Sequence, residues 1–436
     1  MDTDLINHAP FFRSDTAARE LVRAPHRFFL RLAEEYGDIV QYRAAPEAAY
    51  LLNHPDFVQH VLVQNGRNYT KDTHLNKYML QAVTGQGLLT SENPLWRQQR
   101  RLMQPAFHRH NLTNFTTLMV ERTNQMLARW ERFAEEGRPF DIAKEMMGLT
   151  LDIVTSALFS YDIHNHTQAI GDAVNTLIDN PKPQRRIFKE TLAVLDEIVY
   201  GIIAQRQQEN GTQYNDLLDM LLQARYDDGS SMSNQQVRDE VMSLMVAGHE
   251  TTANTLSWLW YLLLQHADIL AQAYAEVDEV LDGRALNETD LPHLPTIEKI
   301  IKEAMRLFPS AWSISRRAVD DDVIGGYAIP AGAIVALSPY VLHRHPAFWQ
   351  NPEQFDPQRF TPEQESTRHR FAYMPFGAGA RKCIGDQFAL MESSVIVPMV
   401  LQRHHLQLVP DHHVEEHALV TLRPRHGILV KIGARV

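Results

Sequence analysis

The sequence predicts a mainly α-helical protein with minor β-structure (an α+β fold) that forms one large domain over residues 1–436. Most segments repeat apolar residues with the helical period of about 3.6. Short alternating patterns, typical of strands, lie near both ends of the chain. No linker is evident between these patterns, which favours a single domain.

Composition excludes several classes of protein. The 42 basic and 53 acidic residues give a net charge of −11, which argues against general affinity for nucleic acid or anionic lipid. The N-terminal residues are too charged for a signal peptide. The longest apolar run, 256–264, is far below the ~20 residues that span a bilayer. We expect a soluble, cytoplasmic protein with no membrane anchor.

One predicted helix is unusually long. Ser233 and Gln236 form a capping signature, and the helical pattern continues to about residue 266, or ~50 Å. Because it is apolar on most faces near its middle, it should cross the core. Further helices are expected at 55–63, 93–133, 142–159, 185–208, 296–308 and 386–403, and strands at 38–42, 48–52, 323–324, 327–329, 333–337 and within 406–430.

Cys383 is the only cysteine, so the chain can form neither an internal disulfide nor a Cys-rich metal site. It lies in the glycine-containing segment 376–385, FGAGARKCIG. Arg381, Lys382 and the N-terminus of the following helix favour the thiolate form. Gly385 leaves room for a flat group, so a thiolate here suits an axial ligand of heme iron. The alternative is a buried, inert thiol.

The centre of the long helix, 247–252, has the unusual sequence AGHETT. Gly248 costs about 1 kcal/mol relative to alanine in a helix. The Thr251 hydroxyl can bond back to the carbonyl of Ala247 and open a small polar groove. The alternative is that Gly248 permits close helix packing and the threonines only cap carbonyls.

These two motifs resemble those of the cytochrome P450 family of heme-thiolate monooxygenases. The cysteine segment matches the family's ligand signature at each fixed position, and 247–252 is similar to its dioxygen-binding motif. The resemblance implies heme b between the long helix and the helix after Cys383, with proton delivery to dioxygen by Glu250 and Thr251. It assigns cofactor-binding roles to Trp96, Arg100, Ala247, Gly248, Arg316, Phe376, Arg381, Cys383 and Gly385.

Other residues follow the family order. Glu303 and Arg306 lie at i, i+3 on one helix face and, with Arg359, resemble the family's structural triad behind the cysteine loop. Trp96 and Arg100 resemble its Trp-x-x-x-Arg contact to a heme propionate.

Two adjacent arginines are candidates for the contact that the resemblance implies with the other heme propionate. The run Arg316-Arg317 leaves a choice, and we prefer Arg316 because its distance to the Gly325-Gly326 turn fits better.

The resemblance implies hydroxylation of a hydrophobic small molecule, such as a fatty acid or terpenoid, with dioxygen and two electrons from a separate ferredoxin or flavodoxin. The lack of an anchor is typical of soluble bacterial members. Candidate pocket segments are 71–90, 247–251, 311–314 and 419–422, with Trp312 as an apolar contact. Arg100, Arg101, Arg381 and Lys382 either form a basic docking patch or are partly occupied by the propionates.

Three alternatives remain. Peroxide-driven chemistry would be expected to lack the pair Glu250–Thr251. A heme protein that binds or senses without hydroxylating is also disfavoured by this pair. A non-heme metal protein is suggested only by histidine pairs such as His404-His405 and His412-His413, which are typical of solvated surfaces.

Overall fold

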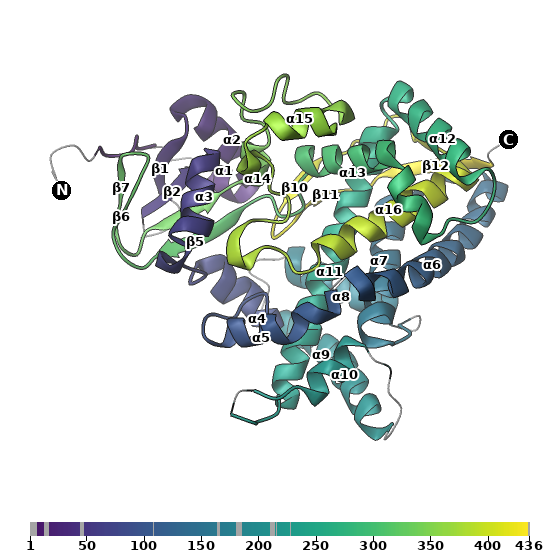
Figure 1. Ribbon diagram of the computed structural model, residues 1–436, viewed down its shortest axis with the longest axis horizontal. Helices are drawn as coiled ribbons and strands as arrows, with labels where there is room; N and C mark the ends of the chain where they lie inside the picture. Colours follow the sequence, from purple (N-terminus) through teal and green to yellow (C-terminus); the bar gives the residue numbers. More distant parts are fainter. Residues whose placement is uncertain are drawn as a thin grey trace. The chain divides into compact units, whose positions relative to one another are not determined.

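The computed structural model describes residues 7–12, 17–43, 48–107, 109–163, 166–179, 185–209, 214, 216–226 and 228–434 (Figure 1). The chain divides into two compact units, each built from separate stretches. Unit 1 comprises Met1–Lys77, Lys302–Cys383 and Val420–Arg423. Unit 2 comprises Tyr78–Ile301, Ile384–Leu419 and Pro424–Val436.

Unit 1 is organised around a five-stranded sheet with the order β1-β2-β8-β5-β3. Only the β2–β8 pair is parallel, and the other three pairs are antiparallel. Its elements are α1 (Ala17–Arg23), α2 (Pro25–Tyr36), β1 (Ile39–Arg43), β2 (Ala48–Leu52), α3 (Pro55–Gln59), β3 (Tyr69–Thr70), β5 (Ile314–Ala318), β6 (Asp322–Ile324), β7 (Tyr327–Ile329), β8 (Ile334–Leu337), α14 (Pro339–Leu342) and α15 (Pro362–Thr367).

The strands form where apolar residues can be buried. Val335 at the centre of β8 and Leu52 at the end of β2 are almost fully buried in the sheet core. The β6–β7 hairpin turns at Gly325 and Gly326, which have φ of +58° and +84°. Two positive φ values are what a tight two-residue hairpin turn requires, and glycine supplies them without steric cost.

A buried ion pair braces unit 1. Glu303 and Arg306 lie near the end of α13 (Pro295–Leu307), and both side chains are fully buried. Arg306 donates from Nε and Nη2 to the two Glu303 oxygens at 2.6 and 2.8 Å. Its remaining N–H groups donate to the carbonyls of three residues of the following segment, His343, Pro352 and Gln354. Arg359 lies 3.4 Å from Glu303, so the expected triad is present.

Unit 2 is helical, with a small sheet in the order β4-β12-β9. Its elements are α4 (Gln81–Thr84), α5 (Leu95–Met103), α6 (Arg109–Glu136), β4 (Phe140–Asp141), α7 (Ile142–Phe159), α8 (Thr167–Asp179), α9 (Arg185–Gln208), α10 (Leu217–Gln223), α11 (Asn234–Leu263), α12 (Ala267–Leu281), most of α13, α16 (Asp386–Arg403), β9 (His404–Leu408), β10 (Glu416–Ala418) and β12 (Leu429–Ala434); β11 (Leu422–Pro424) lies at the unit boundary.

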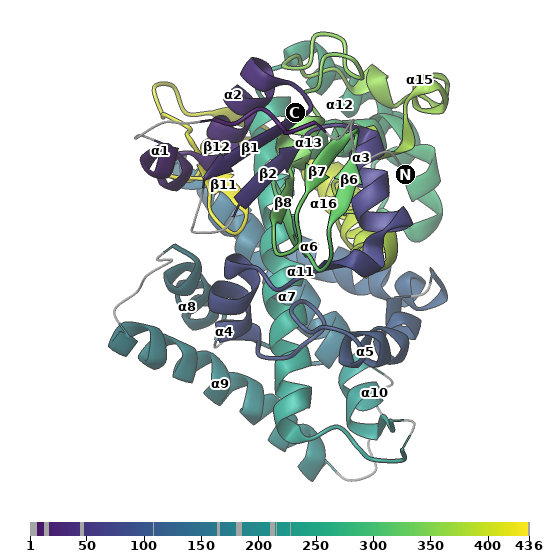
Figure 2. The ribbon, with the colours of Figure 1, turned by 90° about the vertical axis from the view of Figure 1, so that its left-hand side faces the viewer.

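The long predicted helix is α11, and it is continuous from Asn234 to Leu263. Ser233 caps it by accepting a hydrogen bond from the Gln236 amide at 3.1 Å, as the sequence predicts. Figure 2 shows α7 beside α11, and these two helices pack extensively. The core of unit 2 is therefore built along α11.

Two predicted helices are interrupted. The pattern at 93–133 divides into α5 and α6 with a 3-10 turn, Gln104–Phe107, because Pro105 lacks the N–H that a continuous helix needs. The pattern at 55–63 becomes α3 followed by a π-helical turn, His60–Gln64, in which Val61 and Leu62 are buried. Among the described residues, no helix is long and apolar enough to cross a membrane.

Removing one partner of the buried pair should be costly. We expect Glu303→Ala to lower the free energy of unfolding by about 3–5 kcal/mol, because it leaves the Arg306 guanidinium buried without a carboxylate. Urea unfolding followed by circular dichroism measures the loss. The control is Lys302→Ala, which removes a partly exposed pair with Glu365 and should cost about 1 kcal/mol or less. Equal losses for the two variants would contradict a special role for the buried pair.

Candidate active site

The cysteine segment of unit 1 folds back on itself. The Cys383 amide donates to the carbonyl of Phe376 at 3.0 Å, and a 3-10 turn, Gly379–Arg381, lies between them. Gly377 and Gly379 have φ of +68° and +70°, and a Cβ at Gly379 would overlap the carbonyl oxygen of Leu62. The glycines of the motif are thus needed for its backbone path.

His343 connects this segment to the buried pair. Its Nε2 accepts from the Met374 amide at 2.9 Å, and its Nδ1 lies 3.2 Å from the carbonyl oxygen of Arg306. Burial, with the nearby Arg306 charge, lowers the pKa of His343 to about 3, so the ring is neutral. A neutral imidazole has one donor and one acceptor, so Nδ1 donates to Arg306 while Nε2 accepts from Met374.

Cys383 offers a single thiolate ligand, which fits a metal ion whose other ligands come mainly from a cofactor. Cys383 is exposed in the isolated chain, as an axial ligand to an added group must be. Among the residues that the structure describes, no group of three or more His, Cys, Asp and Glu side chains is placed to hold a metal ion. A single thiolate with cationic neighbours therefore matches iron that is already held by a porphyrin.

The two adjacent arginines of β5 have different surroundings. Arg317 donates to the carbonyls of Asp72 at 2.6 Å and Gly332 at 2.9 Å. Arg316 lies on the opposite face of the strand, is 8% exposed, and donates to the carbonyl of its neighbour Ser315. The preference for Arg316 over Arg317 as the anion-binding residue stays a prediction.

In unit 2 the centre of α11 has the hydrogen bond that the sequence predicts. Thr251 Oγ1 donates to the carbonyl of Ala247 at 2.8 Å, and Thr252 Oγ1 reaches that of Gly248 at 3.3 Å. Between Val241 and Trp260 only residues 246–248 and 251 are not fully buried. The motif therefore presents an accessible face on an otherwise buried helix, which fits a flat group lying against it.

Gly248 and His249 have packing roles in unit 2. A Cβ at Gly248 would lie 2.9 Å from Val154 Cγ2 on α7, so glycine allows the close approach of the two helices. Burial lowers the pKa of His249 to about 4, and its neutral ring donates from Nδ1 to the carbonyl of Met245 at 2.6 Å. The Thr150 hydroxyl donates to the His249 carbonyl at 2.9 Å. The packing interpretation of Gly248 is thus supported.

Two carboxyl groups are buried near the threonines. Glu250 is 2% exposed, and Glu392 on α16 is fully buried. Burial raises the pKa of Glu392 well above its usual range, and the Thr252 hydroxyl counters this only in part. Sequence reasoning missed Glu392, although a lone glutamate in the apolar stretch of the last predicted helix is a usable signal.

The remaining predicted residues of unit 2 lie in α5 and just before α16. Trp96 is buried and Arg100 half-buried, one turn apart on α5. Gly385 is the residue before α16, and a Cβ there would be 3.8 Å from Phe107. The candidate site residues therefore form two sets, one in each unit.

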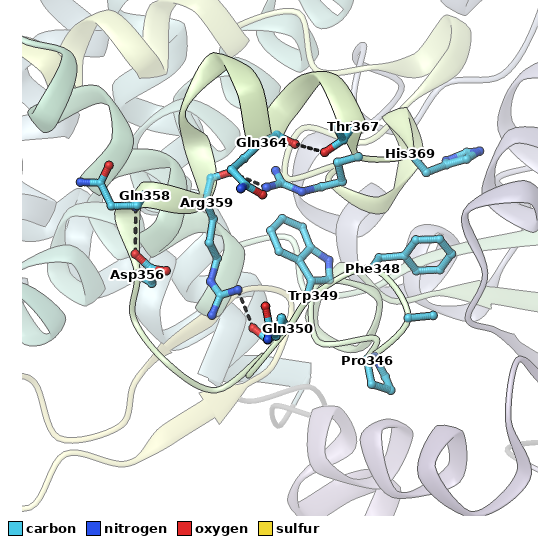
Figure 3. Close-up of a pocket in the computed structure, with 12 residues that line it drawn as sticks. Pro346, Phe348, Trp349, Gln350, Asp356, Gln358, Arg359, Gln364, Thr367 and His369 are labelled. Atoms are coloured by element: carbon cyan, nitrogen blue, oxygen red, sulfur yellow. Dashed lines mark hydrogen bonds between the residues drawn. The ribbon is translucent and has the colours of Figure 1, made fainter.

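Two further features belong to unit 1. Trp312 is 8% exposed and packs in an aromatic cluster with Phe29 and His26, and its expected role as a pocket contact stays a prediction. A polar pocket of about 450 Å³ is lined by residues that include Trp349, Arg359 and others of the 346–369 stretch (Figure 3). None of the predicted site residues lines it, so we do not assign it to catalysis.

Comparison with known proteins gives a consistent result. The family model of cytochrome P450 matches residues 16–431. Cyclooctatin synthase of Streptomyces melanosporofaciens is 36% identical over 89% of this chain and 87% of its own length. Pentalenene oxygenase of Streptomyces avermitilis is 32% identical over 96% of this chain and 95% of its own.

A solved structure agrees with these sequence matches. The crystal structure of the cytochrome P450DA heme domain superposes with a TM-score of 0.91 at 30% identity, covering 99% of both chains. The family implies heme with cysteine thiolate ligation, and the use of dioxygen and a redox partner. The chain belongs to the cytochrome P450 family and is a P450 monooxygenase.

Proposed function

We propose that this protein hydroxylates a hydrophobic small molecule of the terpenoid class. The observation that carries the proposal is the accessible face of α11 at 246–248 and 251, in a chain whose single thiol lies in a loop shaped by glycines. Support for the substrate class comes from the relatives, one of which by its name oxygenates pentalenene, a terpene hydrocarbon. Fatty acids are the second class to test.

Heme b is the proposed cofactor, and the Cys383 thiolate would bind its iron. Arg100, Arg316 and Arg381 are proposed to supply bidentate donors for the two propionates, because carboxylate recognition favours arginine, and Trp96 is proposed as a further contact. The residues proposed to hold the cofactor are Trp96, Arg100, Ala247, Gly248, Arg316, Phe376, Arg381, Cys383 and Gly385. When bound, heme supplies the oxygen-activating redox chemistry, while the protein supplies orientation and proton control.

Thr251 and Glu250 are proposed to control the protons. The Thr251 hydroxyl hydrogen can rotate, so Oγ1 either donates to the Ala247 carbonyl, 2.8 Å away, or donates toward dioxygen. Glu250 is 2% exposed, and a buried carboxyl beside this hydroxyl is suited to hold a proton and pass it on. The burial of Glu250 keeps bulk water from exchanging protons with its carboxyl group directly.

Electron supply and cellular setting complete the proposal. We propose a separate ferredoxin or flavodoxin as donor, a cytoplasmic location, and residues 1–436 acting as a single domain. Support for the single domain is that the family model spans both units. Arg101 and Lys382 are each exposed, as a role in docking a redox partner requires.

The spectrum of the reduced, carbon-monoxide-treated protein tests thiolate ligation. We expect a strongly red-shifted Soret band, because a thiolate donates electron density to the iron. Cys383→Ser should retain the fold, measured by circular dichroism, and lose the shifted band. Fresh, folded wild-type protein without this band would end the heme-thiolate proposal.

A pair of adjacent threonine variants tests proton delivery. Thr251→Ala should keep the carbon-monoxide spectrum but lower product per electron by about tenfold or more, with peroxide formed instead. Thr252→Ala is the matched control and should affect this ratio much less. Unchanged product per electron in Thr251→Ala would contradict the role of Thr251, and undiminished activity with peroxide alone would favour the peroxide-driven alternative.

A ligand screen tests the substrate class. We expect terpene hydrocarbons to shift the ferric spin state of the wild-type protein at lower concentration than fatty acids of similar size. The shift reports displacement of solvent near the heme, so it needs no redox partner. Stronger shifts with fatty acids than with every terpene tested would contradict the terpenoid assignment.

A further inference from the structure

The N-terminal half of α11 contains three consecutive ionisable residues that are buried. Arg238, Asp239 and Glu240 are 5%, 4% and 0% exposed, in a helix that crosses the core. Burying charges is unfavourable unless each is paired or hydrogen-bonded. The hydrogen-bond partners of these three side chains indicate their structural role.

Loop 83–91 provides these partners through its backbone. Asp239 Oδ2 accepts from the Gln86 amide and Glu240 Oε2 accepts from the Leu88 amide, both at 2.8 Å. Arg238 Nη1 donates to the carbonyl of Val83 at 2.9 Å. Hydrogen bonds to charged groups, such as the Arg238–Asp239 ion pair, are stronger than those between neutral groups, and Glu240 adds a third bond, so three successive residues of α11 hold the loop at three points.

Two glutamines connect to the same point of the loop. Gln236 on α11 donates to the carbonyl of Gln86 at 3.2 Å and to Glu240 Oε1 at 2.8 Å. Gln99 on α5 donates to the Gln86 carbonyl at 2.6 Å. The amide and the carbonyl of Gln86 are therefore both held.

Glycines let the loop lie directly on the helix. Gly85 has φ of +56°, and a Cβ there would collide with the Asp239 carboxylate. A Cβ at Gly87 would collide with the Ser243 hydroxyl and the Asp239 backbone. This close backbone contact is possible only for residues without a side chain.

The loop occupies the helix face that continues into the dioxygen motif. Residues spaced by 3, 4, 7 or 11 positions share a helix face, so Glu240, Ala247 and Thr251 lie on one stripe of α11. Glu240 precedes Thr251 by about 16 Å along the axis. Glu240 is covered by the loop, whereas Ala247 and Thr251 remain accessible. The loop thus ends the accessible face on its N-terminal side.

We propose that Asp239 and Glu240 are positioning residues that fix loop 83–91 as a wall of the substrate site. The assignment of this wall to substrate rests on the proposed function. The anchoring itself rests on the hydrogen bonds and glycine contacts. Neither carboxylate needs to touch the substrate, because both act through the loop backbone.

The anchor should depend on pH through Glu240. Burial, with the charge of Asp239, raises the pKa of Glu240 to about 8, although the Leu88 amide and Gln236 oppose this. Tyr226, after α10, is the other titratable group that interacts with it among the described residues. Because the folded pKa exceeds the ordinary 4.5, the stabilisation is complete below about pH 4.5 and is lost as pH rises to 8.

Hydrogen exchange of loop 83–91 in the full-length protein tests the anchor. We expect Glu240→Leu to speed exchange of the loop amides by about tenfold or more, because the Leu88 amide loses its acceptor. Glu240→Gln should keep slow exchange, since its side-chain oxygen can accept the same bond. The control is Glu276→Leu, which removes a carboxylate that accepts from the amides of Thr296 and Ile297. It should speed exchange there and leave loop 83–91 unchanged.

A pH series provides a second test that does not require the leucine variant to fold. After correction for intrinsic rates, protection of the wild-type loop should fall by up to about tenfold per pH unit between 5 and 8, then level off. Glu240→Gln should remove this fall. Protection that is independent of pH in the wild type, or identical pH dependence in Glu240→Gln, would overturn the role of Glu240.

Ligand binding tests whether loop 83–91 is a wall of the substrate site, separately from whether Glu240 anchors the loop. With a ligand that shifts the wild-type spin state, Glu240→Leu should weaken binding by about tenfold, whereas Glu276→Leu should not. Faster loop exchange with unchanged ligand affinity would overturn the substrate-wall proposal and leave the anchor. A wild-type protein without the red-shifted carbon-monoxide band would instead overturn the proposed function, whatever the exchange results.

Discussion

Unit 1 depends on the complete pairing of one buried guanidinium. Arg306 has five N–H groups, and it donates to the two oxygens of Glu303 and to three backbone carbonyls. A buried charge of this kind is tolerated only when every donor is satisfied, so these five bonds fix the path of the segment that supplies the carbonyls. The Arg306 carbonyl holds His343, whose neutral ring holds Met374 just before the cysteine loop. The position of a surface-accessible thiol is thereby set from the interior.

In unit 2, polar side chains are buried within the largely apolar helix α11. Several hydroxyls of α11 bond to carbonyls one turn earlier, as Thr251 does to Ala247. The Nδ1 of the His249 ring does the same with Met245. These groups find their partners within the helix itself, so the helix stays continuous. The accessible stretch at 246–248 and 251 is therefore compatible with a stable core.

Features encoded locally could be predicted from the sequence. The approximate bounds expected for α7, α9 and α16 from apolar periodicity agree with the structure, and the Thr251–Ala247 bond follows from helix geometry. Features that depend on remote partners could not. One example is the packing of Trp312 against Phe29 and His26, which are far from it in the sequence. The partners of Asp239 and Glu240 are backbone amides of a remote loop. Because every residue except proline has a backbone N–H, the sequence does not indicate which of them takes this role.

The attachment of loop 83–91 by its main chain has a consequence for how this protein can change. Gln86 and Leu88 are held by their amides, so exchange of their side chains leaves these attachment points intact. Gly85 and Gly87 are the exceptions, because any side chain there would displace the loop from α11. Variation can therefore alter the chemical lining that the loop presents while its path stays constant. Such an arrangement favours the divergence of ligand preference by single substitutions, without a new fold for the loop.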